Sequence, residues 1–151
     1  MGSITKELFG KTRDEKDVYK FTLCSDTLTV NVLNFGGVVR DILLPGHDGK
    51  GTDVCLGYDT ILGYEDNPAY FGALCGRVAN RIAGASFELD GVKHSLSKND
   101  TIGHNTCHGG LLGLTRRVFD WTIDRVQTHL NVRRCRWRGG VSRSVDSERD
   151  I

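Results

Sequence analysis

Residues 18–44 read VYKFTLCSDTLTVNVLNFGGVVRDILL. Apolar residues alternate with other residues in two short runs, which are Tyr19, Phe21 and Leu23, then Leu28, Val30 and Val32. A period of two is typical of half-buried β-strands. The pair Gly36-Gly37 and the segment PGHDG at 45–49 interrupt this pattern with residues that favour turns. The stretch therefore predicts a meander of antiparallel strands.

The clearest local unit follows at 86–96, SFELDGVKHSL. Its central Asp90-Gly91 pair favours a two-residue type I′ turn. The register then pairs three sets of residues across the hairpin: Leu89 with Val92, Phe87 with His94, and Glu88 with Lys93. No stretch before Asp124 shows a sustained helical spacing of apolar residues, so any helix is expected to be short. The predicted fold class is all-β.

Size and composition indicate a globular protein of one domain. At 151 residues the chain is long enough for one hydrophobic core, and two domains are not expected. No apolar run approaches the roughly 20 residues that span a bilayer, which excludes a membrane protein. The N-terminus lacks the apolar segment of a secretion signal. The five cysteines are odd in number and include no C-x-x-C pair, so reduced thiols in a cytoplasmic protein are expected.

Charge divides the chain near residue 124. Residues 1–124 hold 13 Lys and Arg against 16 Asp and Glu, whereas residues 125–151 hold 7 Arg, no Lys and 3 acidic residues. The second segment also loses the strand alternation and the turn residues. We therefore expect a folded body at 1–124 and an Arg-rich tail at 125–151 outside the fold. One interpretation of the tail is a disordered basic arm for nucleic acid or another anionic partner.

Two segments carry side chains suited to ligand binding. In GRVANRI at 76–82, Asn80 and Arg81 present several fixed donors that suit sugar hydroxyls, although on spacing alone a solvated surface pair is the commoner outcome. In HNTCHGG at 104–110, a ring nitrogen of His108 could donate to a sugar oxygen, because the two glycines that follow leave room for a ligand. The alternative for this histidine is a plain loop residue before a flexible turn.

Two other kinds of site are disfavoured. A zinc site at His104, Cys107 and His108 lacks a paired Cys or His cluster elsewhere to complete it, so no metal is expected. The segment GHDGKGT at 46–52 has two residues between its first Gly and Gly-Lys, where a phosphate-binding loop needs four. We expect it to be a turn between strands.

Five segments together carry a family resemblance. They are Asn34-Phe35-Gly36-Gly37, Asp53-Val54-Cys55-Leu56-Gly57-Tyr58, Tyr70-Phe71-Gly72-Ala73, Gly76-Arg77-Val78-Ala79-Asn80-Arg81-Ile82-Ala83 and His108-Gly109-Gly110. In order and spacing they resemble the aldose 1-epimerase (galactose mutarotase) family, from about Phe9 to Trp121. The resemblance implies an antiparallel β-sandwich of the galactose mutarotase type, incomplete in this chain. It also implies conversion between α- and β-anomers of hexoses such as galactose and glucose, with no cofactor.

The same resemblance implies roles for particular residues. Asn80 and Arg81 match the family's sugar-contacting Asn-Arg pair, and His108 matches the histidine of its His-Gly-Gly motif. The family's histidine acid and glutamate base lie C-terminal to that motif, beyond the recognisable part of this chain. We therefore expect no catalytic residue here, and a truncated chain that is inactive alone. The expected partner is a hexose, with no nucleic acid and no membrane. Cys107 and Leu114 depart from the family pattern, which has an apolar and an aromatic residue there.

The resemblance also gives the tail a second interpretation. Arg136 to Arg143 can be written in codons that read Gly-Gly-Glu-Glu-Gly-Phe-Pro-Gly one nucleotide out of frame, and an acidic run of this kind is typical of the family at this distance past His-Gly-Gly. We therefore favour a frameshift or an aberrant splice over a selected basic arm. Two other functions stay open, a non-catalytic carbohydrate-binding module and an interaction protein that uses the tail.

Overall fold

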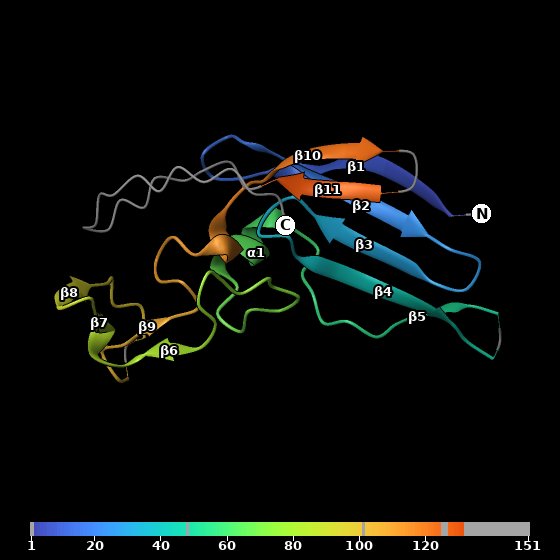
Figure 1. Cartoon of the computed structure of the whole chain (residues 1–151). Coiled ribbons are helices and arrows are strands. Elements are labelled where there is room, and N and C mark those ends of the chain that lie inside the picture. The colour runs from blue at the N-terminus through green and yellow to red at the C-terminus, as the bar shows by residue number, and fades with distance from the viewer. Residues whose placement is uncertain (1, 48, 101, 125–126, 132–151) are drawn as a thin grey trace.

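The computed structural model describes residues 2–47, 49–100, 102–124 and 127–131. Its largest element is a five-stranded antiparallel sheet whose strands lie side by side in chain order (Figure 1). These strands are β1 (Ser3–Lys11), β2 (Asp17–Cys24), β3 (Thr29–Leu33), β4 (Val39–Pro45) and β5 (Gly51–Asp53). The predicted all-β class and the antiparallel meander are confirmed.

Two of the turns that separate these strands lie where the sequence predicts them. Gly36 and Gly37 join β3 to β4 with φ values of +64° and +59°, a conformation that glycine adopts without steric cost. The segment at 46–50 joins β4 to β5, because Pro45 pairs with Gly51 across it. The expected turn between strands is confirmed.

The one α-helix among the described residues is short, α1 (Ile61–Asp66), and it covers one end of the sheet. The hydroxyl of Thr60 accepts a hydrogen bond from the Gly63 N–H and so caps its first turn. Ile61 and Tyr64, one turn apart, are buried against the sheet. The core cluster around α1 consists of Val18, Leu33, Phe35, Val38, Ile61 and Tyr64, with Phe9, Tyr58 and Val118 packed around them, and Phe21 of β2 is also fully buried.

Strand β10 (Asp120–Asp124) pairs with β11 (Gln127–Asn131) in a separate two-stranded sheet, and Trp121 of β10 packs against side chains of β2. The Trp121 ring lies 5.5 Å from that of Phe21 and 5.8 Å from that of Tyr19. The chain reaches this position because Phe119 and Asn34 exchange hydrogen bonds: the Phe119 N–H donates to the Asn34 carbonyl (2.7 Å), and the Asn34 amide donates to the Phe119 carbonyl (3.1 Å). The segment that follows residues 108–110 is thereby tied to the sheet.

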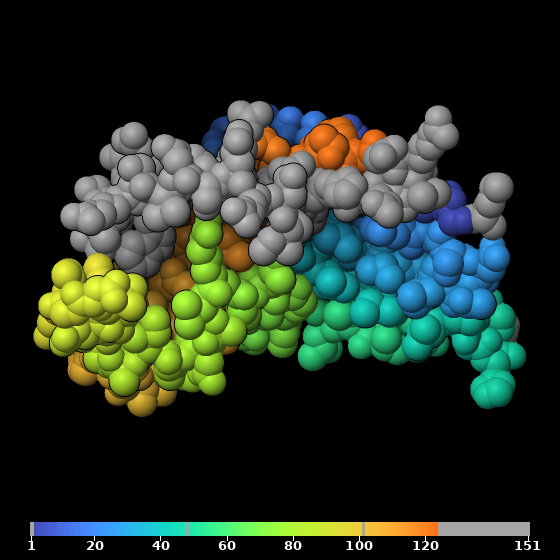
Figure 2. All heavy atoms as spheres, viewed as in Figure 1, coloured from blue at the N-terminus to red at the C-terminus, as the bar shows by residue number. Residues whose placement is uncertain are grey.

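Four other strands form two small ladders (Figure 1), and the residues of this part of the chain lie at the end of the molecule away from β5 (Figure 2). They are β6 (Arg81–Ile82) paired with β9 (Thr106–Cys107), and β7 (Ser86–Leu89) paired with β8 (Val92–Ser95). Two 3₁₀ turns accompany them, η1 (Ala83–Ala85) and η2 (Leu114–Arg116).

The hairpin β7–β8 has the predicted register. Asp90 and Gly91 have φ values of +52° and +73°, as a type I′ turn requires. Phe87 and His94, which oppose each other, stack with their ring centroids 5.0 Å apart. Leu89 and Val92 are more than half exposed, so this face of the hairpin is not part of the core.

The expected boundary at residue 124 falls within the β10–β11 hairpin, since β11 lies at 127–131. The rest of the predicted tail, including the segment from Arg136 to Arg143 on which the frameshift interpretation depends, lies outside the described residues.

Candidate functional site

The ladder between β6 and β9 brings the two candidate binding segments together. Arg81 pairs with Cys107 and Ile82 with Thr106, so Asn80 and His108 lie at the same end of the ladder. The side chain of Asn99 holds β9 from the other side, because its Oδ1 accepts from the Cys107 N–H (2.7 Å) and its Nδ2 donates to the Cys107 carbonyl (2.9 Å). Cys107 is buried, so its thiol packs as a small apolar side chain.

The glycine after His108 serves the packing of the two segments against each other. A Cβ atom at Gly109 would overlap the carbonyl group of Gly76, with the carbonyl carbon at 2.7 Å. A Cβ atom at Gly76 would in turn lie 2.6 Å from Cδ1 of Leu114. Glycine is therefore required at position 109 because two backbone segments of the protein approach each other closely there. The sequence alone suggests access of a ligand as the reason for this glycine.

Asn80 and His108 hold each other through two hydrogen bonds. The backbone N–H of Asn80 donates to Nδ1 of His108 (3.0 Å), and the backbone N–H of His108 donates to the carbonyl of Asn80 (2.9 Å). Both residues have left-handed backbone conformations, with φ values of +61° and +50°. Such conformations cost about 1–2 kcal/mol for residues other than glycine and concentrate at functional sites.

This arrangement fixes the tautomer of His108. A backbone N–H can only donate, so Nδ1 of His108 must be the acceptor, and the neutral ring carries its proton on Nε2. The ring of Tyr70 packs against it with the centroids 4.8 Å apart. His108 therefore presents an oriented N–H donor.

Arg81 is held on two sides by other side chains. Its Nε donates to Oδ2 of Asp100 (2.6 Å), and its Nη1 donates to Oδ1 of Asn80 (3.1 Å). The guanidinium of Arg81 lowers the pKa of Asp100 to about 2, with a smaller contribution from the amide of Asn105. In turn, the hydrogen bond to the Asp100 carboxylate raises the pKa of Arg81. Both groups therefore remain charged throughout the physiological range.

The three predicted residues leave donors available to a ligand. Within the described part of the chain, the hydrogen bonds of this cluster use Nδ1 of His108, Oδ1 of Asn80, and Nε and Nη1 of Arg81. The groups left over are Nε2 of His108, Nδ2 of Asn80 and Nη2 of Arg81, all of which carry hydrogens. The cluster therefore suits a ligand rich in oxygen acceptors.

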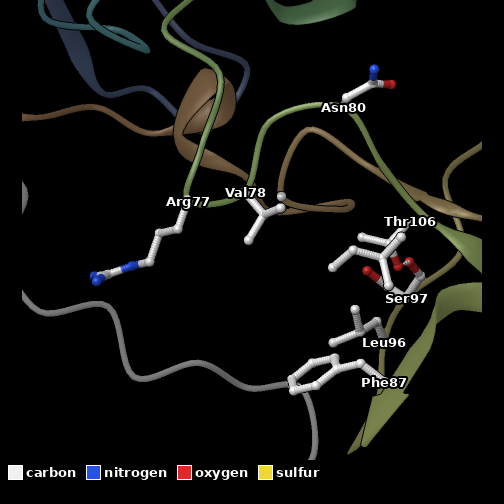
Figure 3. A pocket seen from close by; sticks show the side chains of 9 residues that line it. Arg77, Val78, Asn80, Phe87, Leu96, Ser97 and Thr106 are labelled. Carbon is white, nitrogen blue, oxygen red and sulfur yellow. Dashed lines mark hydrogen bonds between the residues drawn. The ribbon is translucent and has the colours of Figure 1, made fainter.

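A cavity of about 390 Å³ lies beside this cluster, but its lining is mainly apolar. Val78, Phe87 and Leu96 line it together with Ser97 and Thr106, while the Asn80 side chain is directed away from it (Figure 3). An apolar lining offers few partners to sugar hydroxyls. We therefore place the candidate site at the polar cluster rather than in this cavity.

Asp100 and Tyr70 are the residues of the site that sequence reasoning missed. Tyr70 stands within one of the family segments, which was a usable signal. Asp100 contacts Arg81 across 19 residues of sequence, and no spacing rule connects the two. Among the residues that the structure describes, no group of three or more His, Cys, Asp or Glu side chains is placed to hold a metal, and no helix has the length and apolarity to cross a membrane.

Comparison with known proteins gives the family. A sequence model of aldose 1-epimerase matches residues 19–140 of this chain. Galactose mutarotase of Bos taurus is 39% identical over 123 residues, which cover 81% of this chain and 35% of that protein. Maltose epimerase of Levilactobacillus brevis is 37% identical over the same length, again 81% of this chain and 35% of that protein.

The chain belongs to the aldose 1-epimerase family. The structure of galactose 1-epimerase from Lactobacillus acidophilus NCFM superimposes with a TM-score of 0.62 and 28% identity, covering 81% of this chain and 34% of that one. The epimerase fold is therefore shown, and the chain spans about a third of the length of the curated relatives that it matches. The matched range extends to residue 140, beyond Trp121, where the recognisable motifs end.

Proposed function

We propose that this chain binds a hexose at Asn80, Arg81 and His108, as part of an aldose 1-epimerase that interconverts the α- and β-anomers of hexoses such as galactose and glucose. The observation that carries the proposal is that each of these three residues, which the β6–β9 ladder brings together, keeps a donor that the hydrogen bonds of the cluster do not use. Sugar hydroxyls and the ring oxygen supply the matching acceptors. Galactose, which appears in the name of the relative galactose mutarotase, is such a hexose.

The charge of the cluster favours a free sugar over a phosphorylated one. The Arg81 guanidinium is paired with the Asp100 carboxylate at 2.6 Å, so the pair carries no net charge. A phosphate site would require unpaired positive charge to balance its ligand. A neutral polyol needs only directed donors.

Anomerisation requires a base that takes the proton of the anomeric hydroxyl and an acid that protonates the ring oxygen. His108 offers a single proton on Nε2 and has its other nitrogen engaged, so it orients and polarises the sugar but does not serve both roles. We propose that the acid and base of the reaction are not supplied by this chain, which binds sugar without turning it over. The proposed chemistry uses no cofactor.

A non-catalytic carbohydrate-binding module is the second candidate. It is favoured by the same cluster, because the groups free to meet a ligand there are all donors and none is a general base. For either function we propose a cytoplasmic location, which the free thiols of Cys24, Cys55, Cys75 and Cys107 support.

Two measurements on the 151-residue chain test these proposals. Titration with galactose, followed by NMR, should show binding that is weakened roughly ten- to a hundredfold in Arg81→Ala, whereas polarimetry with α-galactose should show no rate above buffer. An absence of binding would refute the hexose site. Catalysis that disappears in His108→Ala would refute the proposal that the acid and base lie outside this chain.

A further inference from the structure

The contact between Arg81 and Asp100 is asymmetric in its exposure. The Asp100 side chain is only 10% exposed, whereas that of Arg81 is 54% exposed. The carboxylate thus lies behind the guanidinium, on the protein side. It is anchored there by its own loop, since Oδ1 accepts from the Ile102 N–H (3.2 Å) and Oδ2 accepts from Nδ2 of Asn105 (3.1 Å).

Two contacts to one guanidinium restrict its orientation. Asp100 engages Nε and Asn80 engages Nη1, and because the group is planar these contacts fix the direction of Nη2. A free arginine side chain has several rotatable bonds, and immobilising it upon binding weakens affinity. An arginine that is already held meets its ligand without that loss.

We propose that Asp100 is a positioning residue, which holds Arg81 by its Nε so that the Nη2 group is presented to the sugar. The inference rests on the proposed hexose site and extends it to a residue outside the three that the family motifs identify. Asp100 does not touch the sugar in this proposal. It acts through Arg81, and it also cancels the positive charge that would otherwise attract anions to the site.

The test is a galactose titration of the 151-residue chain in four forms: unmodified, Asp100→Ala, Arg81→Ala and the double variant. Asp100→Ala should weaken galactose binding roughly three- to tenfold, which corresponds to immobilising one long side chain on binding. The double variant should bind no more weakly than Arg81→Ala alone, because Asp100 acts only through Arg81.

The matched control is Asp66→Ala, which also removes a carboxylate that is paired with an arginine. Asp66 pairs with Arg13, 53 residues away in sequence, through two 2.9 Å contacts that involve none of Asn80, Arg81 and His108. This variant should bind galactose as the unmodified chain does. A second readout is solvent exchange of the Arg81 Nε–H, followed by NMR, which should be faster in Asp100→Ala and unchanged in Asp66→Ala.

Three results would overturn the proposal: affinity retained in a folded Asp100→Ala variant, further weakening in the double variant, or unchanged exchange of the Arg81 Nε–H. If circular dichroism shows that Asp100→Ala does not fold, Asp100→Asn replaces it. This variant should have an affinity between those of the unmodified chain and Arg81→Ala, and faster exchange of the Arg81 Nε–H. An affinity and an exchange rate equal to those of the unmodified chain would count against the proposal. If the unmodified chain binds no galactose, the hexose site fails, whereas the exchange rate still decides by itself whether Asp100 holds Arg81.

Discussion

Replacing Gly109 with alanine should disrupt the candidate site, whereas the same change at Gly91 should not. Both glycines have positive φ, +87° at Gly109 and +73° at Gly91. Alanine in this region costs about 1–2 kcal/mol relative to glycine. The two variants therefore share the backbone strain, and any difference between them comes from the surroundings of the added methyl group.

Those surroundings differ sharply. At Gly91 a Cβ atom meets nothing within 4 Å, whereas at Gly109 it would lie 2.7 Å from the carbonyl carbon of Gly76 and 3.1 Å from the backbone nitrogen of Arg77. Carbon atoms pack best at about 3.5–4.0 Å, so the two segments must separate by about 0.8 Å or more. Forced repacking of this kind adds about 1–3 kcal/mol. The expected total is about 2–5 kcal/mol for Gly109→Ala, against about 1–2 kcal/mol for Gly91→Ala.

Urea unfolding and galactose titration of the two variants provide the measurement. Gly91→Ala should keep the galactose affinity of the unmodified chain, because its hairpin turn contributes nothing to the cluster. Gly109→Ala should lose affinity under conditions where it is still folded, because the displaced segment carries His108. Equal stability and equal affinity in the two variants would refute the claim that close packing against Gly76 assembles the site.

Four further outcomes are expected. Arg81→Ala should weaken galactose binding roughly ten- to a hundredfold by removing a charged hydrogen bond, while Lys93→Ala on the hairpin should leave binding unchanged, and equal losses by NMR titration would show that Arg81 is not a sugar ligand. The pKa of Asp100 lies at about 2 against an ordinary 3.8, so its contribution to stability should be complete above pH 4 and disappear as the pH falls through 2; a carboxyl titration by carbon-13 NMR with a midpoint near 3.8 would contradict this. Phe21→Ala should lower the free energy of unfolding in urea by about 3–5 kcal/mol, because the fully buried ring of Phe21 packs against that of Trp121. A loss under about 1 kcal/mol would mean that the neighbouring side chains move in and fill the space of the removed ring. The transcript for residues 136–143 should contain an alternate frame that reads Glu-Glu-Gly-Phe-Pro-Gly or close to it, and sequencing that finds no such frame would reject the frameshift interpretation.

Local rules were sufficient for the elements whose contacts are close in sequence. The hairpin at Asp90-Gly91 forms with the predicted register, since a two-residue turn with two positive φ values fixes which residues oppose each other. The order of the five strands follows in the same way, because short turns allow each strand to pair only with its neighbour. The predicted site residues were identified by family motifs, and composition alone would have left them as surface residues.

What the sequence determined by itself was the strand meander, the hairpin, the family, and the choice of Asn80, Arg81 and His108 as candidates. Only the tertiary structure decided which atoms of these residues remain available. The Nδ1 of His108 is occupied by a backbone N–H 28 residues away in sequence, and the Nε of Arg81 is occupied by a carboxylate 19 residues away. The physical reason is that a hydrogen bond depends on the position of two groups in space, which the folding of β6 onto β9 sets and the spacing of residues along the chain does not.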